Sequence, residues 1–256
     1  MEYTNQLLVY SPDYELEESV RGYAEYLRDM LGGQICHEPL ASRQDLEHIK
    51  LAAANCDLLI FGEPEQSWLD MLLFGRRCSQ ALSQSSTSFL LARRPRWPIR
   101  SILLILRFEE SDQAAIDWLV RLAQPCAASV SILPIVPSLP AMYSLGSQMY
   151  AGPDVLLSSN TVSGQQLRRV AQQLNQQLIE GELRLRQGEP DWQIRDEVIE
   201  GNYDLILIGE EPHGRIFRFL MGEIVSHLLC WVERPLLVAK SRVHGPKNGN
   251  GRLSTS

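Results

Sequence analysis

The chain has 256 residues, of which 45% are apolar, and its net charge is −7. This length can bury one large core or two cores of ordinary size. The acidic balance excludes a general electrostatic attraction to nucleic acid or to an anionic membrane surface. Five cysteines without a C-x-x-C pair indicate free thiols in a reducing compartment, so we expect a cytoplasmic protein without a membrane segment.

Apolar runs and helical spacing predict alternating elements in the first part of the chain. Strands are expected at residues 6–10, 35–36, 56–62 and 88–92, and helices at 15–31, 45–55 and 68–84. The run at 56–62 is continuously apolar, which is typical of a strand buried on both faces. The basic, proline-rich segment at 93–98 then predicts a linker.

The second part of the chain continues the alternation. Strands are expected at 101–106, 129–136, 182–186, 204–209 and 235–239, and helices at 112–124, 163–180, 192–200 and 220–232. This order requires crossover connections, and therefore a mainly parallel sheet with helices on both faces. The segment at 138–162 has no clear period but is rich in apolar residues, so we expect a lid over the strand ends of the second half.

A repeat with an offset of 147 positions relates the two parts: residues 55–92 match residues 202–239 without a gap (202 − 55 = 147). The same offset places the helix at 15–31 on the helix at 163–180. The repeat predicts two tandem doubly wound, Rossmann-like α/β domains, of which the first lacks the opening strand and helix. We expect the domains at 1–96 and 97–243, followed by a disordered tail at 244–256.

The second half resembles the universal stress protein family. Ala115 and Trp118 fit the family's Ala-x-x-Trp helix, and Gly209 and Gly222 are 13 positions apart (222 − 209 = 13), as in its nucleotide motif. The resemblance implies pairing through the final strands of the two halves, and hence an intramolecular pseudo-dimer. That pairing would protect two otherwise open sheet edges.

The nucleotide motif of the resembling family is altered in this chain. In family members that bind ATP, as the resemblance implies, its glycines and backbone N–H groups hold phosphates at a helix N-terminus. The middle glycine is replaced by Pro212 in the second half and by Glu65 in the first half. Glu223 stands at the Ser/Thr position, and Arg107 stands where the family carries an aspartate on the adenosine side. These changes argue against ordinary ATP binding, because proline lacks an N–H donor and a carboxylate repels phosphate.

Candidate ligand-binding residues lie where the carboxyl ends of parallel strands meet. They are Arg107, Ile135, Val136, Gly209, Gly222 and Glu223, with Gly62, Gly75 and Arg76 as equivalents in the first half. The glycines have two interpretations, as turns that face a ligand or as turns that need close packing. Arg107 is expected to meet a small anion or an acidic partner from the 138–162 loop. Glu109, Glu110 and Asp112 are interpreted as partners of a helix N-terminus.

No catalytic triad, P-loop or metal-ligand spacing is present in the sequence. We therefore expect a non-catalytic stress-response or regulatory binding module without a cofactor, and without a nucleic-acid or membrane partner. One alternative is an adenine-nucleotide-binding protein or weak ATPase that uses the second-half pocket. Another is a cytosolic regulatory domain associated with a membrane transporter. A homodimer and a separate protein partner both stay open.

Overall fold

The computed structural model describes residues 5–11, 18–39, 56–62, 87–135, 153–186, 189–210 and 222–241. The helices expected at 45–55 and 68–84, the first part of the expected lid, and the tail at 244–256 lie outside these residues, so those predictions are untested.

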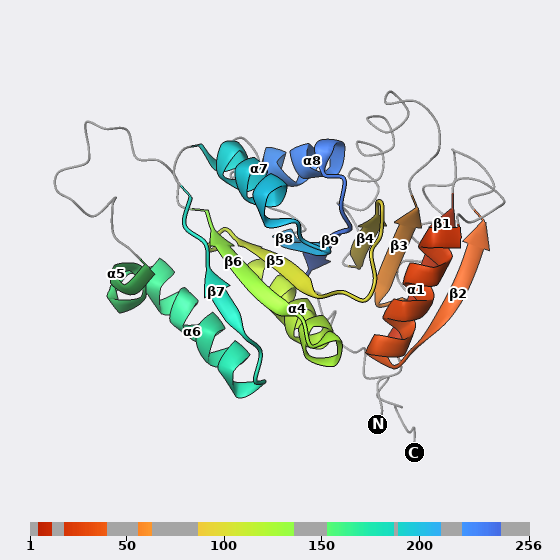
Figure 1. Ribbon diagram of the computed structural model, residues 1–256, viewed down its shortest axis with the longest axis horizontal. Helices are drawn as coiled ribbons and strands as arrows, with labels where there is room; N and C mark the ends of the chain where they lie inside the picture. Colours follow the sequence, from red (N-terminus) through yellow and green to blue (C-terminus); the bar gives the residue numbers. More distant parts are fainter. Residues whose placement is uncertain are drawn as a thin grey trace, which may run out of the picture.

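The described strands form one nine-stranded sheet with the order β2-β1-β3-β4-β9-β8-β5-β6-β7 (Figure 1). Their bounds are β1 Asn5–Ser11, β2 Gly33–Pro39, β3 Leu58–Gly62, β4 Ser88–Ala92, β5 Ser101–Leu106, β6 Ser129–Pro134, β7 Gly181–Leu183, β8 Leu205–Glu210 and β9 Leu236–Lys240. All neighbouring pairs are parallel except β4 and β9. The prediction of a mainly parallel α/β sheet is confirmed.

Helices cover both faces of this sheet. In the described residues they are α1 Glu18–Leu31, α4 Asp112–Cys126, α5 Pro153–Ser158, α6 Val162–Gln176, α7 Pro190–Gly201 and α8 Gly222–Trp231. Helices α1, α4 and α6 share one apolar core, and α7 and α8 share the core on the opposite face. The short helix α5 lies within the segment that the sequence analysis interpreted as a loop.

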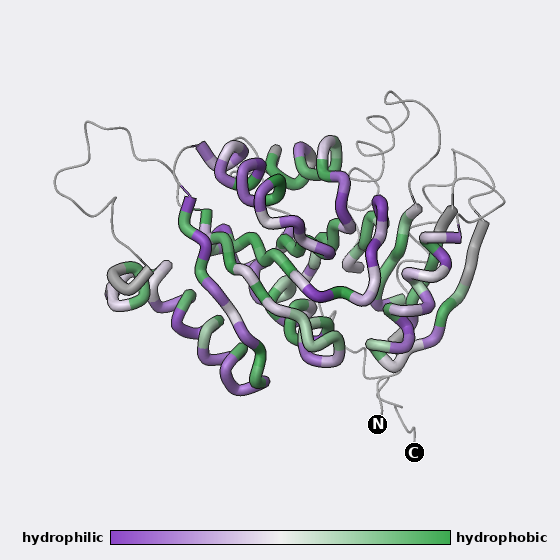
Figure 2. Tube along the Cα trace, in the orientation of Figure 1, coloured by the Kyte–Doolittle hydropathy of each residue, from purple (hydrophilic) through white to green (hydrophobic). Residues whose placement is uncertain are grey.

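The strands supply both cores through alternate residues, which point to opposite faces of a sheet. Leu104 belongs to the core under α1, α4 and α6, whereas its neighbour Leu103 belongs to the core under α7 and α8. Figure 2 shows the strands in the middle of the sheet as mainly hydrophobic along their length. Burial of apolar surface, worth roughly 25 cal/mol per Å², therefore stabilises both faces. Each core draws residues from both halves of the chain.

The two halves meet at the antiparallel pair of β4 and β9, the pair of final strands expected at the junction. Phe89, Leu90 and Leu91 lie opposite Val238, Leu237 and Leu236. Strands β1–β3 lie on one side of this pair and β5–β8 on the other. The sheet thus continues from one half into the other without an exposed edge between them.

The prediction that the first half lacks the opening strand and helix is wrong. Strand β1 pairs with β3 in the register that β5 has with β8, since Leu7 lies opposite Leu58 and Ile102 lies opposite Leu205. The opening strands are therefore 95 positions apart (102 − 7 = 95), not 147. Instead, the edge strand β7 of the second half has no counterpart among the described residues of the first half.

Hydrogen bonds at the start of these strands support the corrected alignment. The Gln6 backbone N–H donates to Asp57 Oδ2 at 2.8 Å, and the Ser101 backbone N–H donates to Asp204 Oδ2 at 3.2 Å. In return, the Asp57 N–H donates to Gln6 O and the Asp204 N–H donates to Ser101 O, at 2.8 and 2.9 Å. Each aspartate closes the same backbone ring in its half.

The opening helices follow the same alignment. The buried positions of α1 are Val20, Tyr23, Ala24 and Leu27. An offset of 95 (118 − 23 = 95) places them on Ala115, Trp118, Leu119 and Leu122, which are all buried in α4. With the offset of 147, Ala24 instead meets Ala171, which is exposed. Helix α1 therefore corresponds to α4 and not to α6.

None of the helices in the described part of the chain combines the length and the hydropathy that a membrane crossing requires.

Candidate functional site

The carboxyl ends of β5, β6 and β8 meet at one edge of the sheet, because these strands are parallel neighbours. Three of the predicted site residues come together there: Arg107 follows β5, Ile135 follows β6, and Gly209 lies near the end of β8. Ile135 is fully buried, and its N–H donates to Leu106 O at 2.7 Å. It shapes the apolar floor and presents no polar side chain. Val136 lies outside the described residues.

The Arg107 side chain is buried between the ends of β5 and β8, with 8% of the residue exposed. Its Nη2 donates to Gly209 O at 2.6 Å and to Ser111 Oγ at 3.2 Å. The same nitrogen lies 2.8 Å from Glu109 Oε2. The guanidinium thus joins the two strand ends, and a carboxylate two residues away neutralises it. A buried charge requires such a partner, because desolvation of an isolated ion is costly.

A tight turn follows Arg107 and is held by one carboxylate. Phe108 has a φ of +62°, which is uncommon for a residue with a side chain. Asp112 Oδ2 accepts the backbone N–H groups of residues 107, 108 and 109, at 3.0, 2.7 and 3.2 Å. Asp112 is therefore a fully buried part of the turn. The earlier interpretation of Asp112 as a partner of the helix N-terminus missed these three bonds.

Burial raises the pKa of Asp112 to about 6, although the three backbone N–H groups and the Arg107 charge act in the opposite direction. Desolvation is the larger effect because the carboxylate loses its water on all sides. The second oxygen, Oδ1, is also buried and has no hydrogen-bond partner among the described residues. The turn thus contains an acid that is costly to ionise.

Gly209 is required by close packing. A Cβ atom at this position would lie 2.6 Å from the carbonyl carbon of Ser111 and still closer to its oxygen. The start of α4 therefore lies directly on the end of β8. Of the two interpretations of this glycine, the geometry favours the structural one, since the space above it is filled by backbone.

The equivalent end of β3 in the first half is less crowded. A Cβ at Gly62 would meet Val20 Cγ2 of α1 at 3.4 Å, an ordinary van der Waals distance. Gly75 and Arg76 lie outside the described residues. In the second half Gly222 begins α8 and Glu223 follows it. Residues 211–221, which separate Gly209 from Gly222, also lie outside the described residues.

The contacts of Arg107 give no indication of a catalytic group at this edge of the sheet. Its partners are a carbonyl, a hydroxyl and a carboxylate of the same chain, and none of them is an activated nucleophile. In the described residues, no group of three or more His, Cys, Asp or Glu side chains could hold a metal ion. From the sequence, Arg107 is unusual for the family that the second half resembles. The pairing of Arg107 with Glu109 is not predictable from the sequence, because that contact depends on the turn at Phe108.

The comparisons with known proteins agree with this fold. The sequence model of the Universal stress protein family matches residues 98–240, which is more than half of the chain. No curated protein matches the sequence.

Solved structures are similar at low sequence identity. A universal stress protein from Archaeoglobus fulgidus has a TM-score of 0.58 at 13% identity, over 93% of this chain and 86% of that one. A Pseudomonas aeruginosa protein classed with the universal stress proteins has a TM-score of 0.59 at 14% identity, over 93% and 94%. The cytoplasmic domain of a prokaryotic cation chloride cotransporter has a TM-score of 0.49 at 13% identity, over 93% and 96%. At these identities the structures show the fold alone. Together with the sequence match, the shared α/β fold leads to one conclusion: the chain belongs to the universal stress protein family.

Proposed function

We propose that this protein is a non-catalytic binding or regulatory module in which the second-half strand ends do not hold an adenine nucleotide. The observation that carries the proposal is the buried Arg107 guanidinium, which bonds Gly209 O at 2.6 Å and Glu109 at 2.8 Å. A nucleotide at this edge would have to displace that side chain and leave Glu109 unpaired. The Glu109 carboxylate would also repel a phosphate.

Calorimetric titration with ATP and with AMP tests this proposal on the full-length protein. We expect no saturable heat for either nucleotide at up to about 1 mM, which corresponds to less than roughly 4 kcal/mol of binding free energy. Micromolar binding of ATP with turnover would support the alternative of a weak ATPase and contradict the proposal. The same titration of Arg107→Asp tests whether Arg107 prevents nucleotide binding, once circular dichroism has shown that this variant is folded. A matched control is Arg195→Asp, which makes the same charge change on the exposed side of α7.

We also propose that the two halves are related domains that pack as an intramolecular pseudo-dimer. The pairing of β4 with β9 supports this, and so does the contact between the opening helices α1 and α4. In that contact Tyr26 Oη lies 3.1 Å from Cys126 Sγ, across the junction. Solution scattering tests the arrangement: a single compact particle is expected, and two separated lobes would contradict it.

The transporter-associated alternative stays a prediction, as do the cytoplasmic location and the possibilities of a homodimer or a protein partner. Native mass spectrometry of the purified protein measures retained small molecules, protein partners and subunit number together. A retained nucleotide would contradict the proposal made for the strand ends.

A further inference from the structure

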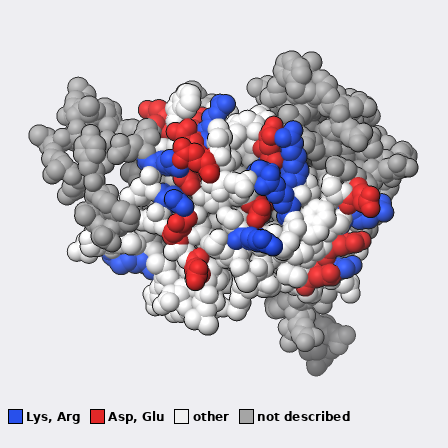
Figure 3. All heavy atoms as spheres, in the orientation of Figure 1, with Lys and Arg blue, Asp and Glu red and all other residues white. Residues whose placement is uncertain are grey.

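The linker between the halves carries basic side chains across one face of the molecule. Figure 3 shows Lys and Arg side chains gathered over the linker in the middle of this face. We call this surface, formed by Arg94, Arg96, Trp97, Arg100 and Arg234, the linker face. It lies near the amino ends of β5, β8 and β9, at the opposite end of β5 and β8 from the candidate site described above. All of these residues lie in the described part of the chain.

Two guanidinium groups of the linker face converge on one uncharged oxygen. Arg96 Nη1 donates to Asn202 Oδ1 at 2.9 Å, and Arg234 Nη2 donates to the same oxygen at 3.1 Å. Among the described residues, no carboxylate forms an ion pair with Arg96 or Arg234. Burial lowers the pKa of Arg234, and the neighbouring Arg96 charge lowers it further. The two cations thus repel each other across a neutral acceptor.

The two carboxylates that act on Arg234 have other partners. Glu233 pairs with Arg94 at 2.5 Å. Asp204 Oδ2 accepts two backbone N–H groups where the linker enters β5, at 2.9 and 3.2 Å. Asp204 offsets part of the Arg234 charge, but Arg100 adds another exposed cation to the linker. The linker face therefore has an excess of positive charge, although the chain as a whole has a net charge of −7.

Helix ends explain why the arginines gather here without carboxylates. Helix α7 ends beside Asn202, whose φ is +47°, and Arg93 Nη1 donates to Val232 O at the end of α8. A helix C-terminus carries about half a negative charge, so it attracts cations. That partial charge holds Arg96 and Arg234 in place but does not neutralise two full charges. Their remaining charge is available to an anionic group from another molecule.

An exposed aromatic ring lies in the same linker. Trp97 is 45% exposed. Its ring is anchored on α1, since a Cβ at Gly22 would lie 3.1 Å from it and the Tyr23 ring centroid is 6.2 Å away. Pro95 and Pro98 restrict the backbone on either side. Trp and Arg are enriched among the residues that dominate binding energies, and a restricted segment loses little entropy on binding.

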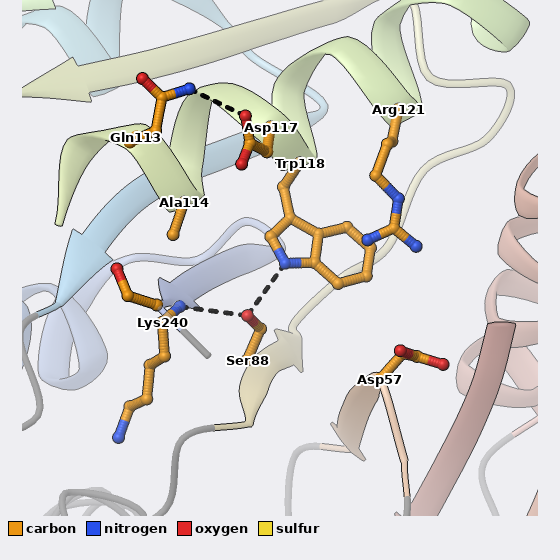
Figure 4. A pocket seen from close by; sticks show the side chains of 9 residues that line it. Asp57, Ser88, Gln113, Ala114, Asp117, Trp118, Arg121 and Lys240 are labelled. Carbon is orange, nitrogen blue, oxygen red and sulfur yellow. Dashed lines mark hydrogen bonds between the residues drawn. The ribbon is translucent and has the colours of Figure 1, made fainter. Parts of the chain in front are cut away.

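The equivalent place beside α4 is built differently. The offset of 95 positions places Tyr23 on Trp118 (118 − 23 = 95). Trp118 Nε1 donates to Ser88 Oγ at 2.9 Å (Figure 4), whereas Tyr23 packs against Trp97. The linker therefore lies against α1, and each chain should offer one linker face.

From the two guanidinium groups on Asn202, the excess positive charge and the anchored Trp97, we propose that the linker face binds an acidic peptide segment of a protein partner. A carboxylate of that segment would lie between Arg96 and Arg234, because a guanidinium holds a carboxylate through two parallel hydrogen bonds. An apolar side chain next to it would contact Trp97. This face does not depend on whether the β5 and β8 strand ends bind a nucleotide.

An acidic peptide fits better than a long polyanion. Nucleic acid or an anionic membrane extends beyond the linker face onto the rest of a chain whose net charge is −7. A short segment meets mainly the local charge, since salt screens charges that are more than roughly 10 Å away at about 0.1 M ionic strength.

A fluorescein-labelled peptide of three Glu-Glu-Leu repeats is the probe for this proposal. Its binding to the full-length protein is measured by fluorescence anisotropy at about 0.1 M ionic strength. The NMR signal of the Trp97 indole N–H, assigned with Trp97→Phe, reports contact at the linker face. A peptide of three Gln-Gln-Leu repeats is the uncharged control. A single-stranded oligonucleotide and phosphatidylserine vesicles test the two long polyanions.

Two variants with matched controls change the charge of the linker face. Asn202→Asp supplies the carboxylate that the two guanidinium groups lack, and Asn175→Asp makes the same change on the exposed side of α6. Aspartate, like asparagine, tolerates the left-handed conformation of residue 202. Arg96→Gln removes one cation, and Arg169→Gln is its control on α6. Circular dichroism checks that each variant is folded.

We expect one acidic peptide per chain, a Kd on the order of 100 µM, and a shift of the Trp97 signal that the uncharged peptide does not reproduce. Because exposed charges are screened, Asn202→Asp should weaken binding about five-fold and Arg96→Gln about three-fold. Neither control variant should change it. The proposal is overturned if the acidic peptide does not bind at about 1 mM, or if the uncharged peptide binds equally well. It is also overturned if Asn202→Asp and Asn175→Asp bind alike, or if the oligonucleotide or the vesicles bind more tightly than the peptide.

Discussion

Asp112 combines full burial with a structural role in the turn after β5. Its raised pKa of about 6, against an ordinary value of 3.8, means that the folded protein binds a proton more tightly than the unfolded chain. As the pH rises from 4 to 6, the folded state must give up that proton, so this residue lowers the free energy of unfolding across that window. Below pH 4 both states are protonated and the cost disappears. The full cost is present above pH 6 and is on the order of 3 kcal/mol.

Replacement of this acid tests that sign. Asp112→Asn keeps an oxygen that can accept the backbone N–H groups but cannot ionise. The free energy of unfolding of Asp112→Asn, minus that of the wild type, should rise steadily between pH 4 and 6. Above pH 6 this difference should stay constant. Urea unfolding followed by circular dichroism at intervals of half a pH unit measures this difference. A difference between the two proteins that does not vary with pH would contradict the prediction.

The sequence shows which residue at the site is unusual, but it does not show which partners that residue contacts. Arg107 was recognisable from the sequence because it replaces an aspartate of the family pattern. Its pairing with Glu109 and Gly209 O depends on the positive φ of Phe108 and on the approach of β8. Neither of these follows from the order of residues alone.

Two equivalent glycines, Gly209 and Gly62, test how closely the start of α4 packs on the end of β8. Gly209→Ala should lower the free energy of unfolding by about 1–3 kcal/mol, because its Cβ would overlap the Ser111 carbonyl and the backbone must move. Gly62→Ala is the matched control, since its Cβ meets only the end of the Val20 side chain at 3.4 Å. We expect it to change stability by less than about 1 kcal/mol. Equal losses in thermal or urea unfolding of the two variants would show that close packing does not distinguish these sites.

At the scale of elements, the strands were the most predictable part of the fold. The continuous apolar runs that became β4 and β5 were placed with their observed bounds, because a strand buried on both faces leaves no polar interruption. Helix α1 was predicted close to its observed bounds but matched to the wrong helix. In the sequence its apolar spacing fits the helix at 163–180 as well as the helix at 112–124, since every amphipathic helix repeats apolar residues at three and four. The pairing of β1 with β3 and the burial of Ala115 but not of Ala171 separate the two alignments.

The whole molecule depends on the junction of β4 and β9, which makes one sheet of two halves. Leu90 and Leu237 lie opposite each other in this pair and belong to the same core as residues of both α1 and α4. Loss of one half would therefore expose apolar surface of the other half. The repeated sequence predicted which strands meet here, but the mixing of residues from both halves in each core was visible only in the structure.

Because both cores span the junction, we expect the protein to unfold in a single transition with equal calorimetric and van't Hoff enthalpies. Two separate transitions in scanning calorimetry would contradict this expectation and show that the halves are independent.

Leu90→Asp would place a charge in the buried pair and should lower the free energy of unfolding by about 3 kcal/mol or more. If the junction couples the halves, this variant either melts as one unit at a lower temperature or separates into two transitions. Leu178→Asp is the control, since Leu178 is 92% exposed and its substitution should leave the transition unchanged. A junction variant that melts like the wild type would mean that the shared sheet does not hold the halves together.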